Sequence, residues 1–150
     1  MSVDVTTVVE IARPRTEVAT YAMDPDHATI WYKNITSVKW ITPRPLTVGS
    51  RIALTARFLG RSLSYTYEVK ELVPNERFLQ STTEGPFPME TTYRWGSLPS
   101  GVTKMYLRNR GEPSGFSNVM APLIGRAMRR ANREDLARLK AILESGNEAP

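Results

Sequence analysis

The sequence predicts an α+β fold: a curved, seven-stranded antiparallel sheet wrapped around one long C-terminal helix, with two short helices after the first strand. Two observations carry this prediction. Apolar residues alternate with polar ones through most of the first two thirds of the chain, which is the period of strands with one buried face. In the last third, apolar residues instead recur every three or four positions, which is the period of an amphipathic helix.

The N-terminal segment is predicted to form one strand and both short helices. The odd positions of residues 3–11 share the more apolar face of the strand. Pro14 ends the strand and suits the first position of a helix, which is predicted over residues 14–23, although Arg13 is a poor cap. The second short helix begins at Asp24, whose carboxylate can accept hydrogen bonds from free amides.

Six further strands are separated by turns that contain proline or glycine. They are predicted over residues 35–42, 51–59, 62–72, 77–83, 90–96 and 103–109. Short connections between successive strands imply an antiparallel meander. The concave face is predicted to carry the even positions of 52–58, the odd positions of 63–69 and 89–95, and Met105 with Leu107. Residues 78–82 leave the choice of face open.

One long helix is predicted over residues 117–144, with a kink or a later start near Ala121 because Pro122 and Gly125 disturb its beginning. A single helix cannot cover the concave side of a sheet this large, so the geometry predicts a cavity between them. Residues 1–146 are expected to form one domain, followed by a flexible tail at 147–150.

Composition restricts the chemistry. The chain has 150 residues, a formal net charge of +5, one histidine and no cysteine, which excludes disulfides, thiolate chemistry and zinc-finger spacings. The positive charge is spread along the chain, so nucleic acid is not an expected partner. No apolar run approaches the ~18 residues that a membrane span requires. We therefore expect a cytoplasmic protein, monomeric or homodimeric, with no metal and no cofactor.

Several short motifs occur in a distinctive order over nearly the whole chain. They are Asp24-Pro25 with Trp31, Val48-Gly49-Ser50-Arg51, Tyr67-Glu68-Val69, Leu72-Val73-Pro74-Asn75-Glu76-Arg77 and the segment 136–144. This pattern resembles the START-like (SRPBCC) superfamily, which has the helix-grip fold of the birch pollen allergen, and within it the bacterial polyketide cyclase/dehydrase-like and lipid-transport proteins. The chain departs from the family at Arg13 and at Ser100-Gly101-Val102-Thr103, both of which are turns. The resemblance implies a ligand-binding domain.

Candidate ligand-binding residues are those expected on the concave face or near the mouth of the cavity. They are Trp31, Phe58, Tyr65, Tyr67, Met89, Thr91, Tyr93, Met105, Ile124 and Met128. The methionines suit an adaptable pocket, because their side chains are flexible and polarizable. Trp31 is either a lid contact at the cavity mouth or an ordinary core residue.

Three side chains are candidate catalytic groups. Tyr65 and Tyr67 lie two positions apart on one strand face, so both hydroxyls should point into the cavity, where a phenol can bind a carbonyl or donate a proton. His27 is the only side chain with an unperturbed pKa near neutrality. The alternatives are buried tyrosines that only pack and a histidine on an exposed helix.

Two features of the long helix remain open. Asp135 lies close to the apolar stripe, where a ligand or a polar cavity group could pair with it. We favour an ion pair with Arg138 at the edge of the stripe. Arg126, Arg129, Arg130 and Arg133 form a basic face that is either solvated or in transient contact with an anionic membrane.

The sequence thus supports three functions. The first is binding of a hydrophobic small molecule, lipid or polyketide-like, in the cavity. The second, implied by the resemblance, is a polyketide aromatase/cyclase that uses pocket hydroxyls or His27. The third is a protein-interaction domain similar to co-chaperones.

Overall fold

Seven antiparallel strands form one sheet in the computed structural model, which describes residues 3–112 and 121–145. The strands are β1 (Val3–Ile11), β2 (Ile35–Trp40), β3 (Arg51–Phe58), β4 (Arg61–Val73), β5 (Arg77–Glu84), β6 (Met89–Leu98) and β7 (Val102–Gly111). Their order across the sheet is β1-β7-β6-β5-β4-β3-β2. The predicted meander from β2 to β7 is confirmed, and β1 closes the sheet by pairing with β7.

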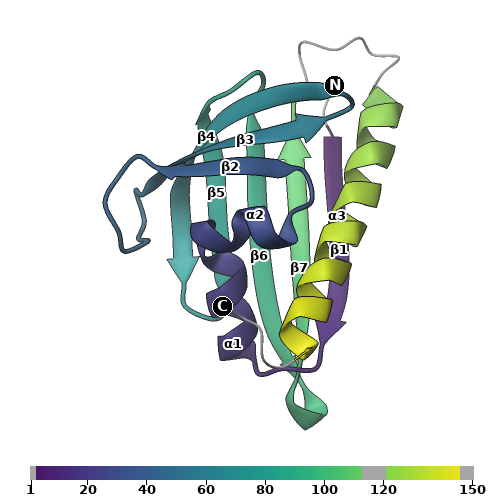
Figure 1. The fold of residues 1–150 in the computed structure, drawn as a ribbon. Helices are drawn as coiled ribbons and strands as arrows, with labels where there is room; N and C mark the ends of the chain where they lie inside the picture. The colour runs from purple at the N-terminus through teal and green to yellow at the C-terminus, as the bar shows by residue number, and fades with distance from the viewer. Residues whose placement is uncertain (1–2, 113–120, 146–150) are drawn as a thin grey trace.

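The helices lie on the concave side of this sheet. They are α1 (Arg15–Met23), the 3₁₀ turn η1 (Pro25–His27), α2 (Ala28–Trp31) and α3 (Ala121–Glu144), and a further 3₁₀ turn, η2 (Pro99–Gly101), joins β6 to β7. Figure 1 shows the sheet curling so that α3 runs along β1, while α2 lies between β2 and α3 and contacts both. This is the helix-grip fold that the sequence predicts.

The short helices begin close to the predicted positions. Pro14 is the N-cap of α1 rather than its first residue, with an extended backbone and no side chain that caps the helix. The carboxylate of Asp24 accepts a hydrogen bond from the amide of Asp26 at 2.9 Å, as expected for the cap of η1.

Tight turns set the ends of several strands. Leu59 and Gly60 both have positive φ (53° and 77°), which is the conformation of a two-residue hairpin loop, so β3 ends at Phe58 and that residue pairs with Arg61. Ser100 and Gly101 also have positive φ (67° and 74°), and the compact turn extends β6 and β7 beyond their predicted limits. β2 ends at Trp40, two residues early, because the amides that follow both donate to the carbonyl of Arg51.

The main core lies where α3 packs on the sheet. Leu136, Leu139 and Leu143 are buried in one cluster with apolar side chains of β1, β6 and β7. At the other end of α3, Ile124 and Met128 pack with residues of β1. The inward positions predicted for β3, β4, β6 and β7 face this concave side, and the open choice in β5 is settled by Phe78, which is buried in the main core.

Helix α3 is uninterrupted from Ala121 to Glu144. Pro122 lies in the first turn of this span, where its missing amide proton breaks no helical hydrogen bond, so the predicted later start is favoured over a kink. Residues 117–120 of the predicted helix and the tail at 147–150 lie outside the described residues.

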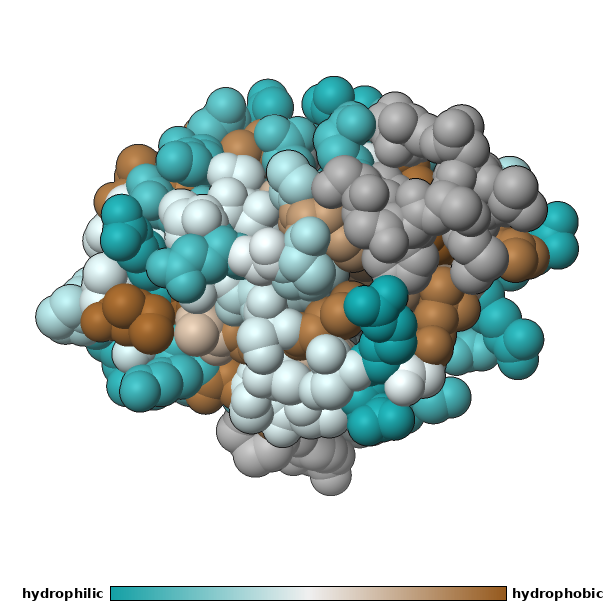
Figure 2. Space-filling view, turned by 90° about the horizontal axis from the view of Figure 1, so that it is seen from above, coloured by the Kyte–Doolittle hydropathy of each residue, from teal (hydrophilic) through white to brown (hydrophobic). Residues whose placement is uncertain are grey.

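Figure 2 views the molecule from the end where α3 begins. On the part of this face formed by described residues, hydrophobic surface appears as separate patches between hydrophilic side chains. Within residues 3–112 and 121–145, no helix is long and apolar enough to cross a membrane.

The packing of α3 gives a test of the fold. Leu139 is fully buried (0% exposed), so we expect Leu139→Ala to lower the free energy of unfolding by about 3 kcal/mol through lost contacts and a new cavity. Leu123, on the same helix, is 47% exposed, and Leu123→Ala should change stability by less than about 0.5 kcal/mol. Urea denaturation followed by circular dichroism measures both. Equal losses in the two variants would contradict this assignment of the helix face.

Candidate ligand-binding cavity

A cavity of about 170 Å³ lies between the concave face of the sheet, the α1–α2 segment and helix α3. Its apolar walls come mainly from β3 and β4, including Ile52, Leu54 and Leu63, with Phe87 and Met89 from the region where β5 leads into β6. α3 contributes a mixed stripe of Met128, Ala131, Asn132 and Asp135. The cavity exists because α3 packs against β1 and β7 and leaves the inner surface of β3 and β4 uncovered.

Seven of the ten residues predicted to bind ligand line this cavity. They are Phe58, Tyr65, Tyr67, Met89, Thr91, Tyr93 and Met128. The other three are not among the described residues of the lining. Trp31 and Met105 are fully buried in the main core, and Ile124 is buried against β1, so the core alternative for Trp31 is the one the structure supports.

Tyrosine hydroxyls supply part of the polar surface. Tyr32 and Tyr93 share a short hydrogen bond between their hydroxyl groups. Burial raises the pKa of Tyr67 to about 12 and also raises the pKa of Tyr65 and Tyr93 above the ordinary value. These phenols therefore keep their protons at neutral pH and act as hydrogen-bond donors.

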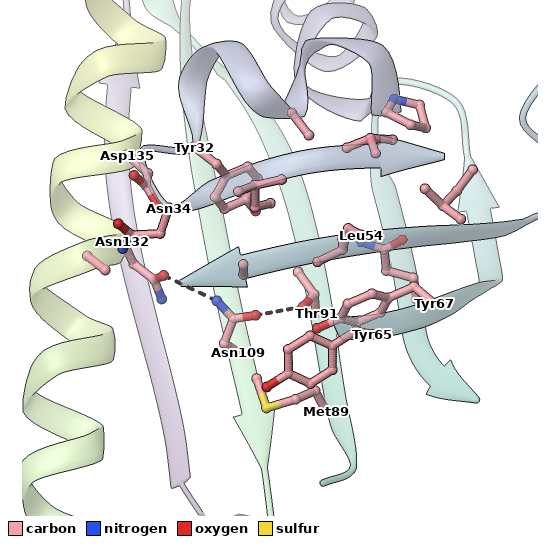
Figure 3. Close-up of a pocket in the computed structure, with 18 of the residues that line it drawn as sticks. Tyr32, Asn34, Leu54, Tyr65, Tyr67, Met89, Thr91, Asn109, Asn132 and Asp135 are labelled. Atoms are coloured by element: carbon pink, nitrogen blue, oxygen red, sulfur yellow. Dashed lines mark hydrogen bonds between the residues drawn. The ribbon is translucent and has the colours of Figure 1, made fainter. Parts of the chain in front are cut away.

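A chain of polar side chains crosses from the sheet to α3 (Figure 3). The hydroxyl of Thr91 donates to Asn109 Oδ1 at 2.6 Å, and Asn109 Nδ2 donates to Asn132 Oδ1 at 3.3 Å. All three side chains are buried, with at most 9% of their surface exposed. At the end of the chain, Asn132 Nδ2 has no hydrogen-bond partner among the described residues. A buried donor left in this way costs free energy unless another group fills the position.

Asp135 lies one turn further along α3, also facing the cavity. It is 4% exposed, and its Oδ1 accepts a hydrogen bond from the backbone amide of Lys33 at 2.9 Å. The favoured ion pair with Arg138 at the edge of the stripe is wrong, because the carboxylate is buried and no described cation lies within salt-bridge distance of it. Burial raises the pKa of Asp135 to about 6. The cavity therefore contains a carboxylate that is partly protonated just below neutrality.

His27 lies outside the cavity lining. Its ring stacks on Tyr21 with centroids 4.0 Å apart, and its Nδ1 lies 3.0 Å from the Tyr21 carbonyl oxygen. Nε2 is 3.8 Å from the carboxylate of Asp24. These contacts tie η1 to α1 and hold the imidazole outside the described lining of the cavity.

Sequence reasoning missed several polar residues of the cavity, among them Tyr32, Asn34, Asn109 and Asn132. Asn109 continues the inward alternation of Met105 and Leu107, so the period of β7 was a usable signal. Asn132 is four residues from both Met128 and Leu136, and helical spacing places it on their face. Tyr32 and Asn34 follow α2 in a segment without periodicity, where no pattern indicates direction.

The basic face of α3 is exposed at all four arginines, and Arg130 pairs with Glu134 at 3.2 Å. Among the described residues, no group of three or more histidine and acidic side chains is placed to hold a metal ion.

The fold and the cavity define a protein of the helix-grip class. The sequence profile described as "Polyketide cyclase / dehydrase and lipid transport" matches residues 2–144, and the chain belongs to this family. No curated protein matches it significantly in sequence.

Solved structures agree on the fold. A protein from Thermus thermophilus, TTHA0849, is 18% identical with a TM-score of 0.83, and the match covers 97% of this chain and 99% of that one. A START superfamily protein from Mycobacterium smegmatis is 16% identical with a TM-score of 0.82, covering 95% and 97%. The Zhui aromatase/cyclase from a Streptomyces species is 16% identical with a TM-score of 0.82, covering 99% and 98%. At these identities the likeness shows the fold alone.

The raised pKa of Asp135 predicts a pH-dependent stability effect. Its pKa is about 6 in the folded chain against an ordinary 3.8, so the unfolded chain loses the proton first and stability falls as pH rises between these values. We expect Asp135→Asn to raise the free energy of unfolding by about 1–3 kcal/mol at pH 7.5, with no difference from wild type at pH 3.5. Urea denaturation at both pH values measures the difference.

Asp26 serves as the control, because its pKa is shifted in the opposite direction from that of Asp135. Hydrogen bonds from Arg44 and Trp40 lower its pKa, so its ionised form stabilises the fold above the ordinary pKa and this contribution is lost as pH falls. Asp26→Asn should therefore be less stable than wild type at pH 7.5. A stabilised Asp26→Asn, or a destabilised Asp135→Asn, would contradict these assignments.

Proposed function

We propose that this protein binds a hydrophobic small molecule, lipid or polyketide-like, in the cavity between the sheet and α3. The observation that carries the proposal is the cavity itself, whose walls are mainly apolar on β3 and β4 and mixed on α3. Apolar burial would supply most of the affinity, at about 25 cal/mol per Å². Membership in a family described by lipid transport and polyketide cyclisation supports the same class of ligand.

The proposal is tested by filling the cavity. Ala56 faces the cavity from β3, and Thr55 beside it faces the outer side of the sheet. We expect Ala56→Phe to weaken binding at least tenfold, because the added ring occupies ligand space, and Thr55→Phe to leave binding within about twofold. Native mass spectrometry of the purified protein and thermal shift with a panel of lipids and aromatic polyketides measure this. Absence of any bound or stabilising compound, or equal effects of the two variants, would reject the proposal.

A second function, polyketide cyclisation, is favoured by one specific observation. Asp135 places a carboxylate with a raised pKa in a cavity lined by tyrosine hydroxyls, and an aldol closure needs both a base and donors for the enolate oxygen. In this scheme Asp135 removes the proton next to a carbonyl, and Tyr65 or Tyr67 donates a hydrogen bond to the developing oxyanion. The fold likeness to an aromatase/cyclase is compatible with this role.

Substitutions separate this enzyme function from binding alone. If the chain is a cyclase, Asp135→Asn should lower turnover of a synthetic poly-β-ketone at least a hundredfold, and Tyr65→Phe or Tyr67→Phe about tenfold, while His27→Gln leaves turnover unchanged. Product analysis by liquid chromatography and mass spectrometry gives the rates. Undetectable turnover by wild type with tight binding of the same compound would leave binding as the function.

A further inference from the structure

Three polar side chains, Asn34, Asn132 and Asp135, lie at one corner of the cavity. Figure 3 shows Asn132 and Asp135 on successive turns of α3 with Asn34 beside them, on the opposite side of the view from Tyr65 and Met89. Residues three apart on a helix are neighbours, with Cβ atoms about 5–6 Å apart. Asn132 and Asp135 therefore lie on one face of α3, and both line the cavity.

The two side chains offer complementary chemistry. Asn132 Nδ2 is a buried donor with no partner among the described residues. The Oδ1 of the same amide accepts a hydrogen bond from Asn109. Asp135 uses Oδ1 to accept from the Lys33 amide, and no hydrogen bond from the described part of the chain engages its Oδ2. One donor and one acceptor thus point into the corner with unused capacity.

The orientation of the amides follows from the network. The Thr91 hydroxyl donates to Asn109 Oδ1, which turns Asn109 Nδ2 toward Asn132 Oδ1.

We propose that this corner recognises a neutral hydroxyl group, alcoholic or phenolic, on an otherwise apolar ligand: the hydroxyl oxygen accepts from Asn132 Nδ2, and its proton is donated to the Asp135 carboxylate. A single hydroxyl satisfies both groups because it is at once a donor and an acceptor. The inference rests on the proposed binding function and specifies the head group that the cavity selects.

The same corner disfavours an anionic head group. A ligand carboxylate placed there would face the Asp135 carboxylate in a water-poor site, where like charges repel strongly. The nearby charged side chains are Lys33, Glu134 and Arg138, and Lys33 is itself engaged by Glu134 at 3.8 Å. Arg57 also lines the cavity, but its side chain is exposed, at an outward position of β3, and so lies at the rim.

Three compounds of one ring size test the proposal: naphthalene, 2-naphthol and 2-naphthoate, titrated into wild type by calorimetry at pH 7.5. We expect 2-naphthol to bind at least fivefold more tightly than naphthalene, since it alone fills the free positions of the corner. We expect 2-naphthoate to bind at least tenfold more weakly than 2-naphthol. Equal affinity for naphthalene and 2-naphthol would overturn the inference. Tightest binding of 2-naphthoate would also overturn it and would indicate that the head group binds Arg57 at the rim.

Variants assign the selectivity to the two side chains. Asn132→Leu, of similar shape, should reduce the preference for 2-naphthol over naphthalene to less than about twofold, and Asp135→Asn should relieve the penalty against 2-naphthoate severalfold. Met89→Leu, at the apolar end, should change the affinities for naphthalene and 2-naphthol by the same factor. Thermal unfolding confirms that each variant folds, and Asp135→Asn still decides the question if Asn132→Leu does not fold.

The two levels of the proposal fail in different ways. If wild type binds none of the three compounds, hydrophobic ligand binding is contradicted and the head-group inference falls with it. If all three bind but the variants leave the ratios of affinity unchanged, ligand binding stands and the role of Asn132 and Asp135 is rejected.

Discussion

Helix α3 covers only one side of the concave face of the sheet, and the cavity depends on this partial coverage. Its leucines pack with β1, β6 and β7, and Ile124 packs with β1, which fixes the helix at that side. Tyr65 and Tyr67, on the far side, form a cluster of their own that shares no buried member with either cluster of the helix. Because the sheet curls, it surrounds part of the space between these clusters. Side chains do not fill this space, which is the cavity.

Polar groups in this space are arranged so that most of them satisfy one another. Tyr32 bonds to Tyr93, and Thr91 bonds to Asn109, which bonds to Asn132. Each of these hydrogen bonds offsets the cost of removing its groups from water. The network ends at the amide donor of Asn132, which has no partner among the described residues, and the buried carboxylate of Asp135 lies on the next turn of α3. A polar group of a ligand would therefore be expected to bind at the α3 side of the cavity.

The fold could be predicted from sequence because alternation and helical periodicity report which side of an element is buried. They do not report how deeply a buried position lies. Met105 and Ile124 have the correct inward direction, but they lie in the packed contact between α3 and the sheet and belong to the core. The edge position predicted for Asp135 fails for a related reason: an apolar stripe suggests a dry core, whereas a stripe that faces a cavity tolerates polar side chains. Phe87 lies between strands, where no period applies.

On helix α3, the residues that stabilise the fold and the residues that give the cavity its polarity are at different positions. Leu136, Leu139 and Leu143 supply packing in the main core, while Asn132 and Asp135 line the cavity. A change in the first set removes buried apolar surface and weakens the fold. A change at Asn132 or Asp135 alters the polarity of the corner while the contacts of the leucines remain. Because these positions are distinct, the chemistry of the ligand can change with the fold preserved, which is consistent with structural neighbours at 16–18% identity that superpose over nearly their whole length.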